Sequence, residues 1–377
     1  MKIVIAPDSF KESMSALEAA CAIEEGFKTI YPTADYIKVP MADGGEGTVQ
    51  SIIDATGGTL KKLSVTGPLL SSVDAFYGIS GDKKLAVIEM AAASGLEKVL
   101  PQDRNPLITT TIGFGELIED AINEGVSEIL LGIGGSATND GGAGIIQRLG
   151  GKLLDENNSP ISPNGEGLGR LRKIDISNMN PRLKEIKIRV ACDVDNPLTG
   201  PNGASFIYGP QKGGTPEQLE LLDQNLSHYA SLIKKQLKKD VEFLPGAGAA
   251  GGLGAGLVAF LDGKLERGGN LLVDILDLEE KISGADLVIT GEGGINHQTI
   301  FGKTPVAVSR VAKKHNVPVI AIAGSLSKGY EEIFKEGITA AFSIIPEFSS
   351  LQAALEKGPV NLKNTAANIA KVMKIRL

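Results

Sequence analysis

The sequence predicts an α/β protein with two domains, and three observations support this. Short runs of β-forming residues alternate with helical patterns along almost the whole chain. The runs LAVIEM (85–90) and EILLGI (128–133) are almost wholly apolar and are bounded by turn residues, as buried parallel strands usually are. The chain has 377 residues, which at roughly 150 residues per domain corresponds to two or three domains.

The individual elements follow from local patterns. Ser15 and Glu18 form a capping box for a helix over 16–30, and Thr215 followed by Pro216 and Gln218 starts another helix. A further helix is expected near 46–56. Strands are expected at 2–6, 35–39, 85–90, 128–133, 186–191, 286–290, 317–322 and 339–344.

Composition excludes several classes of protein. Lys and Arg number 38 against 45 Asp and Glu, so a net charge of −7 argues against a nucleic-acid binder. Two cysteines and three histidines provide neither a disulfide framework nor zinc spacing. The uncharged stretch Phe243–Leu261 contains Pro245 and six glycines, so we interpret it as a loop and a buried helix, not a membrane span. These features predict a cytoplasmic protein without a membrane partner.

Glycine is the unusual component, with 47 residues gathered in clusters. A glycine-rich loop between a strand and a helix offers free backbone N–H groups to phosphate, and neighbouring acids suggest Mg²⁺ between carboxylate and phosphate oxygens. Three of the four glycine-rich segments follow a predicted strand, and three carry an acid beside a glycine. The segments are MADGGEGT (41–48), GIGGSATNDGGAG (132–144), GAGAAGGLGAG (246–256) and TGEGGINHQTIFGKT (290–304).

Two nucleotide motifs match in part. Gly246 to Gly251 satisfies G-x-G-x-x-G, and Glu266 or Asp274 lies about 20 residues further on, so a dinucleotide site stays an alternative. HQTIFGKT (297–304) ends like a Walker loop, but His297 occupies the position of the first glycine, and we reject that motif.

Phosphoryl transfer fits the remaining pattern. This chemistry needs backbone donors around the phosphates, a metal ion, a cation and a carboxylate that orients the acceptor hydroxyl. Asp193 and Asp195 follow the predicted strand 186–191 and can supply such a carboxylate. The structural alternative for Asp193 is a turn that opens the following loop.

At these residues the chain resembles the class I bacterial glycerate kinases. The resemblance implies ATP and Mg²⁺ as cofactors, D-glycerate as the small-molecule substrate and 2-phosphoglycerate as product. It also implies two α/β domains, one flavodoxin-like with a parallel sheet and one mixed, with the active site in the cleft between them. The resemblance runs from end to end through APDSFKESMSA (6–16), PMADGGEGT (40–48), RNPLITTTIGFGELI (104–118), GIGGSATNDGGAG (132–144), CDVDNPLTGPNGAS (192–205), YGPQKG (208–213), GAGAAGGLGAG and GEGGINHQTIFGK.

With this family in view, we place one domain at 1–66 plus 285–377, built from both chain ends, and an inserted domain at 67–284. Asp193 and Lys11 are the expected catalytic residues. Lys11 with Ser9 and Arg104 is expected to bind glycerate. Asp43 and Glu292, followed by Asp8 and Asp195, are the metal candidates. The expected phosphate-binding residues are Gly134, Gly135, Ser136 and Thr138, followed by Gly248, Gly251 and Gly252.

The fourth segment departs from the family pattern, because Gly294 stands where an arginine is usual and Asn296 where an aspartate is usual. The departure leaves other activities open: phosphorylation of another hydroxy acid or at the 3-position, a weakened nucleotide-binding protein, or a nicotinamide-dependent oxidoreductase. Whether the chain forms a homodimer also stays open.

Overall fold

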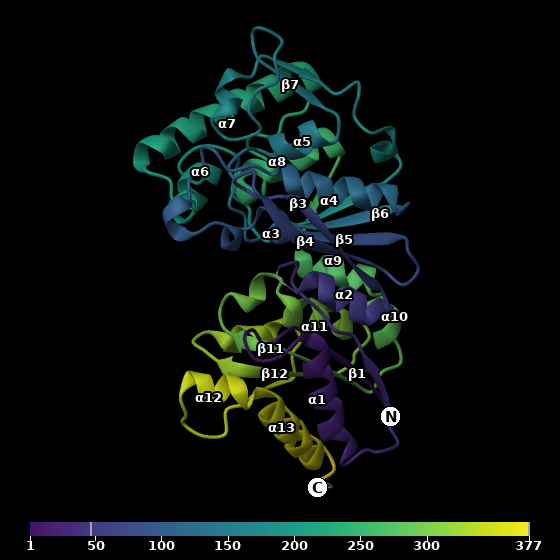
Figure 1. Ribbon diagram of the computed structural model, residues 1–377. Coiled ribbons are helices and arrows are strands. Elements are labelled where there is room, and N and C mark those ends of the chain that lie inside the picture. Colours follow the sequence, from purple (N-terminus) through teal and green to yellow (C-terminus); the bar gives the residue numbers. More distant parts are fainter. Residues whose placement is uncertain (46, 376–377) are drawn as a thin grey trace. The chain divides into compact units, whose positions relative to one another are not determined.

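The computed structural model describes residues 1–45 and 47–375. Glu46, which belongs to the first glycine-rich segment and to the predicted helix 46–56, lies outside the described residues. The chain forms two compact units (Figure 1). We call Met1–Gly57 with Arg267–Leu377 the split unit, and Gly58–Glu266 the continuous unit.

The limits of these units differ from the sequence-based limits at 66/67 and 284/285. The segment 58–66 joins the continuous unit because it pairs with a neighbouring strand over Thr59–Thr66. The segment 267–284 joins the split unit because its two short helices pack on the helix Thr304–Lys314.

The split unit is built on a five-stranded sheet in the order β2-β1-β11-β12-β13, and every neighbouring pair is parallel. This is the flavodoxin-like order 2-1-3-4-5, so the expectation of one flavodoxin-like domain is confirmed. The strands are β1 (Lys2–Pro7), β2 (Asp35–Lys38), β11 (Leu287–Ile295), β12 (Val319–Leu326) and β13 (Ala340–Ser343).

Helices cover both faces of this sheet. On one face α1 and α13 lie side by side, and Ile23 and Leu362 pack with Ile3 and Ile5 of β1 (Figure 1). The predicted capping box starts α1: the Ser15 hydroxyl accepts from the Glu18 N–H, and the Glu18 carboxylate accepts from the Ser15 N–H. Helix α11 contacts β1 and β11, and the short helices α9 and α10 pack on α11. The helices are α1 (Ala16–Lys28), α2 (Thr48–Thr56), α9 (Gly268–Ile275), α10 (Leu278–Ile282), α11 (Thr304–Lys314), α12 (Leu351–Glu356) and α13 (Gly358–Met373).

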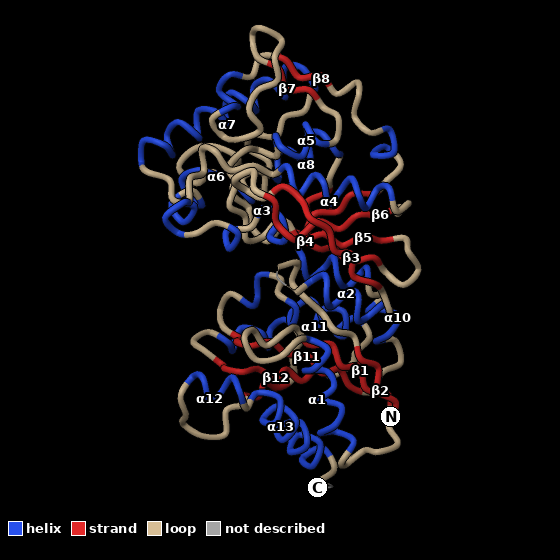
Figure 2. The backbone as a smooth tube through the Cα atoms, in the orientation of Figure 1, coloured by secondary structure: helices blue, strands red, loops and turns tan. Residues whose placement is uncertain are grey.

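The continuous unit has a six-stranded mixed sheet in the order β10-β9-β6-β5-β4-β3. Figure 2 labels its strands β3, β4, β5 and β6. The four strands from β10 to β5 are parallel, and β4 and β3 add an antiparallel hairpin that the sequence analysis did not predict. A separate two-stranded sheet pairs β7 with β8. The strands are β3 (Thr59–Thr66), β4 (Ser72–Ile79), β5 (Leu85–Glu89), β6 (Glu128–Gly132), β7 (Lys152–Leu154), β8 (Lys173–Asp175), β9 (Lys187–Ala191) and β10 (Lys264–Glu266).

Helices pack around this mixed sheet and share one apolar core with it. The predicted start at Thr215 is confirmed, because Thr215 and Gln218 form a capping box at the head of α7. The uncharged stretch ends in a buried helix, α8, as predicted. No helix among the described residues has the length and hydropathy needed to cross a bilayer. The helices are α3 (Ala91–Ser94), α4 (Ile112–Asn123), α5 (Ala143–Arg148), α6 (Ala204–Tyr208), α7 (Pro216–Leu237) and α8 (Ala249–Leu261).

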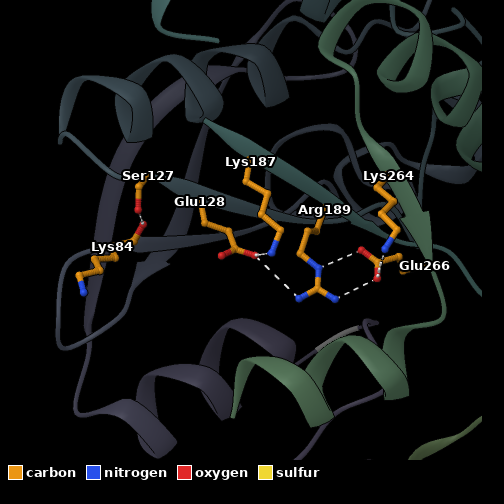
Figure 3. A network of polar contacts seen from close by, with 7 residues as sticks. All are labelled: Lys84, Ser127, Glu128, Lys187, Arg189, Lys264 and Glu266. Carbon is orange, nitrogen blue, oxygen red and sulfur yellow. Dashed lines mark hydrogen bonds and ion pairs between the residues drawn. The ribbon is translucent and has the colours of Figure 1, made fainter. Parts of the chain in front are cut away.

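One face of the parallel strands carries buried charge. Arg189 on β9 is 6 % exposed and binds Glu266 on β10 through two hydrogen bonds of 2.9 Å (Figure 3). Its Nη1 also lies 3.8 Å from the Glu128 carboxylate on β6. The guanidinium lowers the pKa of Glu266, so this carboxylate stays ionised and paired. The network joins three neighbouring strands and is a structural feature of the sheet.

Candidate functional site

A polar pocket of about 220 Å³ lies in the split unit where β1 and β11 end. In the order 2-1-3-4-5, β1 and β11 lie on either side of the point where the strand order reverses. Open α/β sheets bind ligands at this point. We call this the carboxylate pocket, and its lining residues are Asp8, Ser9, Lys11, Asp43, Glu292, Gly293, Gly294 and Lys303.

Two of its three acids are almost fully buried. Asp8 follows β1 and accepts hydrogen bonds from the Ser9 N–H at 2.6 Å and from the Thr304 hydroxyl at 2.7 Å. Burial, together with the charge of Asp43, raises its pKa to about 6. Glu292 on β11 accepts from the Thr299 hydroxyl at 2.8 Å, and burial raises its pKa to about 7. The pocket therefore holds carboxylates that are costly to ionise without a cation.

Two lysines face the same pocket. Lys11 was predicted and is exposed, whereas Lys303 was not predicted. Lys303 precedes α11, and its Nζ lies 3.7 Å from Glu292 Oε2. It belongs to the segment 297–304, whose Gly-Lys-Thr ending was a usable signal even though the complete Walker motif is absent.

The fourth glycine-rich segment is part strand and part loop. Its residues up to Ile295 belong to β11 and pair with β12, and the loop begins at Asn296. Gly294 lines the pocket, and a Cβ at this position would meet only Ser325 Oγ, at 3.3 Å. The Asn296 carboxamide accepts from the Gln298 N–H at 2.8 Å and so holds a turn. An aspartate would accept the same bond, so asparagine keeps this turn while removing one charge.

The donor set of the carboxylate pocket fits a hard cation. No group of three or more His, Cys, Asp or Glu side chains among residues 1–45 and 47–375 is arranged to hold a metal ion by itself. Mg²⁺, however, usually binds one or two carboxylates together with waters and substrate phosphates. Asp8, Asp43 and Glu292 can provide such oxygen ligands, and burial raises the pKa of Asp8 and of Glu292, so both acids are costly to ionise unless a cation compensates their charge.

The second candidate site is the glycine loop, residues 133–142, between β6 and α5 in the continuous unit. Gly134 and Gly135 are exposed, and nothing lies within 4 Å of a Cβ placed on Gly134. The loop is fixed from one side, because the Leu96 N–H donates to the Gly135 carbonyl and the Ala137 N–H donates to the Ser94 carbonyl. The four residues predicted to cradle phosphate thus lie in one loop, with open space beside Gly134 and with Ser136 and Thr138 buried.

Two buried charges support the glycine loop, and neither was among the predicted site residues. The Asp140 carboxylate accepts from the N–H groups of Thr111, Gly142 and Gly144 and from the Thr111 hydroxyl. Lys212 is 1 % exposed and donates to Ser136 Oγ at 2.7 Å and to the Thr138 carbonyl at 2.6 Å. Burial raises the pKa of Asp140 and lowers that of Lys212 to about 7. The signal for Lys212 was its place in YGPQKG.

The third glycine-rich segment serves packing in this structure. A Cβ on Gly251 would lie 2.0 Å from the Thr138 carbonyl oxygen, and a Cβ on Gly248 would lie 2.2 Å from the Pro197 carbonyl oxygen. The N–H groups of Gly248 and Gly252 donate to Asn196 and Gly248 carbonyls. Close contact between chain segments therefore accounts for glycine at these positions, and their role in phosphate binding stays a prediction.

The remaining predicted residues lie in the continuous unit. Asp193 and Asp195 are exposed and follow β9, as expected from the strand 186–191. Arg104 donates through Nη1 to the Gln211 carbonyl at 3.4 Å, and its buried Nε has no partner among the described residues. Arg104 lies in the continuous unit, whereas Ser9 and Lys11 lie in the split unit.

The dinucleotide alternative has no geometric support. Its motif needs a strand directly before the glycines, and in the described chain no strand lies between α7 and α8. Glu266 is one of the two acids that lie about 20 residues beyond this motif, and its carboxylate is already bound by Arg189.

Comparison with known proteins gives a consistent result. The family model described as "Glycerate kinase family" matches residues 3–374. A protein of Halalkalibacterium halodurans named glycerate kinase is 56 % identical over 98 % of this chain and 97 % of its own length. A protein of Escherichia coli K12 named glycerate 2-kinase is 54 % identical over 100 % of this chain and 98 % of its own length.

A solved structure agrees with these relatives. The crystal structure of a Salmonella typhimurium LT2 protein provisionally named glycerate kinase 2 is 54 % identical to this chain, with a TM-score of 0.93. The match covers 99 % of this chain and 98 % of that one. The α/β fold class predicted from sequence is therefore confirmed.

Proposed function

Since this chain belongs to the glycerate kinase family, we propose that it transfers the γ-phosphoryl group of ATP to D-glycerate and releases 2-phosphoglycerate and ADP. The resemblance identified from the sequence motifs is confirmed by this membership. The 2-position is supported by the name of the Escherichia coli relative. The observation that carries the proposal is the carboxylate pocket. Acids and lysines from separate segments meet there, at the point where the strand order of the parallel sheet reverses.

The carboxylate pocket suits an anionic substrate that arrives with a cation. Lys11 is exposed at its rim and can bind the glycerate carboxylate, while the Ser9 hydroxyl can bind a glycerate oxygen. Arg104 stays a further candidate for the glycerate carboxylate. Mg²⁺ held by Asp8, Asp43 and Glu292, with Asp195 as a further candidate, would supply positive charge to phosphate oxygens.

The glycine loop suits the phosphates of ATP. Gly134 and Gly135 are exposed, with open space beside Gly134, and the buried Ser136 and Thr138 add hydroxyl groups after a parallel strand. Amide and hydroxyl donors bind an anion without adding negative charge, whereas carboxylates would repel it.

Asp193 is the residue that we assign to the acceptor hydroxyl. The glycerate hydroxyl oxygen bonds to the γ-phosphorus, and the bond from that phosphorus to the β,γ-bridging oxygen breaks. The hydroxyl proton passes to the Asp193 carboxylate and then to water. An ordinary aspartate is a weak base, but a loose transition state needs little proton removal at an early stage. Lys11 adds positive charge near the group that is transferred.

Phosphorus NMR tests this proposal directly. The pure protein is incubated with ATP, Mg²⁺ and D-glycerate, and the phosphorus signals are compared with those of authentic 2- and 3-phosphoglycerate. We expect ADP and 2-phosphoglycerate in equal amounts. A 3-phosphoglycerate signal would correct the position, and an absence of any organic phosphate beyond ATP would overturn the kinase assignment.

A further inference from the structure

Lys212 is a charged residue in a place where charge is costly. It ends the short 3₁₀ helix Pro210–Lys212 and is 1 % exposed. A buried ammonium group is tolerated only when its N–H groups are bonded. Its two partners, Ser136 Oγ at 2.7 Å and the Thr138 carbonyl at 2.6 Å, both belong to the glycine loop.

The direction of these hydrogen bonds fixes what Ser136 can do. An ammonium group has three donors and no acceptor, so Ser136 Oγ must accept from Lys212. A serine hydroxyl has a single hydrogen, which is then left to donate to another group. Within the described residues Lys212 is the one hydrogen-bond partner of Ser136 Oγ, and Ser136 is 7 % exposed. While its amine is protonated, Lys212 thus leaves this hydroxyl able only to donate.

The neighbouring hydroxyl also has unused capacity. Thr138 is fully buried, and its Oγ1 has no hydrogen-bond partner within the described residues. A buried hydroxyl without a partner is destabilising, and a ligand oxygen within hydrogen-bond distance would relieve this cost. The open backbone of Gly134 lies in the same loop. These donors, together with the Lys212 charge behind them, are complementary to a phosphate group.

We propose that Lys212 is a positioning residue for nucleotide binding, which holds the Ser136 hydroxyl as a donor to a phosphate oxygen of ATP. This inference rests on the proposed function, in which the glycine loop binds the phosphates. Lys212 is covered by the loop and acts through Ser136, so it does not itself contact the nucleotide.

The test is a double-mutant cycle with Lys212→Met and Ser136→Ala, which keep the approximate volume of each side chain. We expect either change to raise the KM for ATP and its Kd by about 10-fold or more, with the KM for glycerate changed less than about twofold. If Lys212 acts through Ser136, the double variant binds ATP about as weakly as Ser136→Ala alone. Lys235→Met, on the exposed side of α7, is the matched control.

Several outcomes would overturn the inference. Additive effects on ATP binding, an unchanged KM for ATP, or a raised KM for glycerate alone would each exclude it. All three leave wild-type kinase activity intact, so they are distinct from a failure of the proposed function, in which the wild type shows no turnover.

If Lys212→Met does not fold, a pH series replaces it. Lys212 has a pKa near 7, and Asp140 is the charged group that opposes this lowering. ATP affinity of the wild type should then fall above pH 7, and Ser136→Ala should lose that part of the pH dependence. Identical pH profiles for the two proteins would exclude the role of Lys212.

Discussion

The carboxylate pocket and the glycine loop both follow parallel strands, yet they present opposite chemistry to a ligand. In the split unit, Asp8 and Glu292 are buried acids whose pKa values are raised by burial, so their ionised forms are destabilised unless a cation compensates them. In the continuous unit, backbone amides, hydroxyls and the buried Lys212 favour negative charge. We therefore propose that the pocket binds a metal ion and that the loop binds an anion directly.

Alanine substitutions at two glycines distinguish a glycine that is needed for packing from one that is needed for ligand binding. Gly251→Ala should lower the free energy of unfolding by about 4 kcal/mol, because its Cβ would meet the Thr138 carbonyl and its φ is +70°. Gly134→Ala should change that free energy by less than about 0.5 kcal/mol, because open space surrounds it, but should raise the KM for ATP. Urea denaturation and initial rates measure both. Equal loss of stability in the two variants would remove the distinction.

The acids of the pocket should make stability depend on pH. Glu292 keeps its proton up to a pKa of about 7 when folded and loses it near 4.5 when unfolded. The folded chain therefore binds more protons in this window, and its free energy of unfolding falls as the pH rises through it. Glu292 accounts for about 3 kcal/mol of this fall in the free energy of unfolding, and we expect Glu292→Gln to abolish that part. Denaturation at several pH values measures it, with the exposed Glu331→Gln as control.

Lys212 should act in the opposite direction at higher pH. Its pKa is lowered to about 7, so above pH 7 the unfolded chain binds more protons than the folded chain. The contribution of Lys212 to the free energy of unfolding therefore rises with pH from about 7 upward. Lys212→Met should flatten this rise in the same denaturation series. If the free energy of unfolding of Lys212→Met rises with pH as much as that of the wild type, other groups cause the rise.

Asp193→Asn should lower turnover by at least about 10²-fold while the melting temperature stays unchanged. The amide keeps the shape of the side chain but cannot take the proton of the acceptor hydroxyl. Initial rates at saturating ATP and glycerate measure the effect. Wild-type turnover in this variant would remove Asp193 from the mechanism.

Glu292→Gln should raise the concentration of Mg²⁺ needed for half-maximal activity by about 10-fold. The expected change in the KM for ATP is smaller if the glycine loop binds phosphate on its own. Rates over a magnesium series measure the shift, and Glu331→Gln again provides the control. An unchanged magnesium requirement would move the metal site away from the carboxylate pocket.

The elements that the sequence predicted are those with local signals. The helices that follow Ser15 and Thr215 begin at capping boxes, which depend on residues three positions apart. Asp43 and Glu292, two acids of the carboxylate pocket, were predicted as metal candidates because each stands beside a glycine in a glycine-rich segment. The hairpin of β3 and β4 was missed, because most side chains of β3 are exposed or half-buried and give no apolar run.

The residues that were missed depend on distant contacts. Lys212 lies in a segment that looks like a surface turn, and its burial comes from residues 74 and 76 positions away. The GEGG residues of β11 were expected in a loop, but pairing with β12 keeps them in the strand. Such contacts cannot be read from local patterns, because tertiary packing overrides local preference.

The position of β1 also affects how the chain matures on the ribosome. This apolar strand leaves the exit tunnel early, yet β11, one of its two neighbours in the sheet, lies 284 residues later. At about 5–20 residues per second, synthesis takes roughly 15–60 s to supply that neighbour. The continuous unit, Gly58–Glu266, lies between these two strands in the sequence and can fold within this interval, so β1 pairs with β11 only after the whole continuous unit has been synthesised.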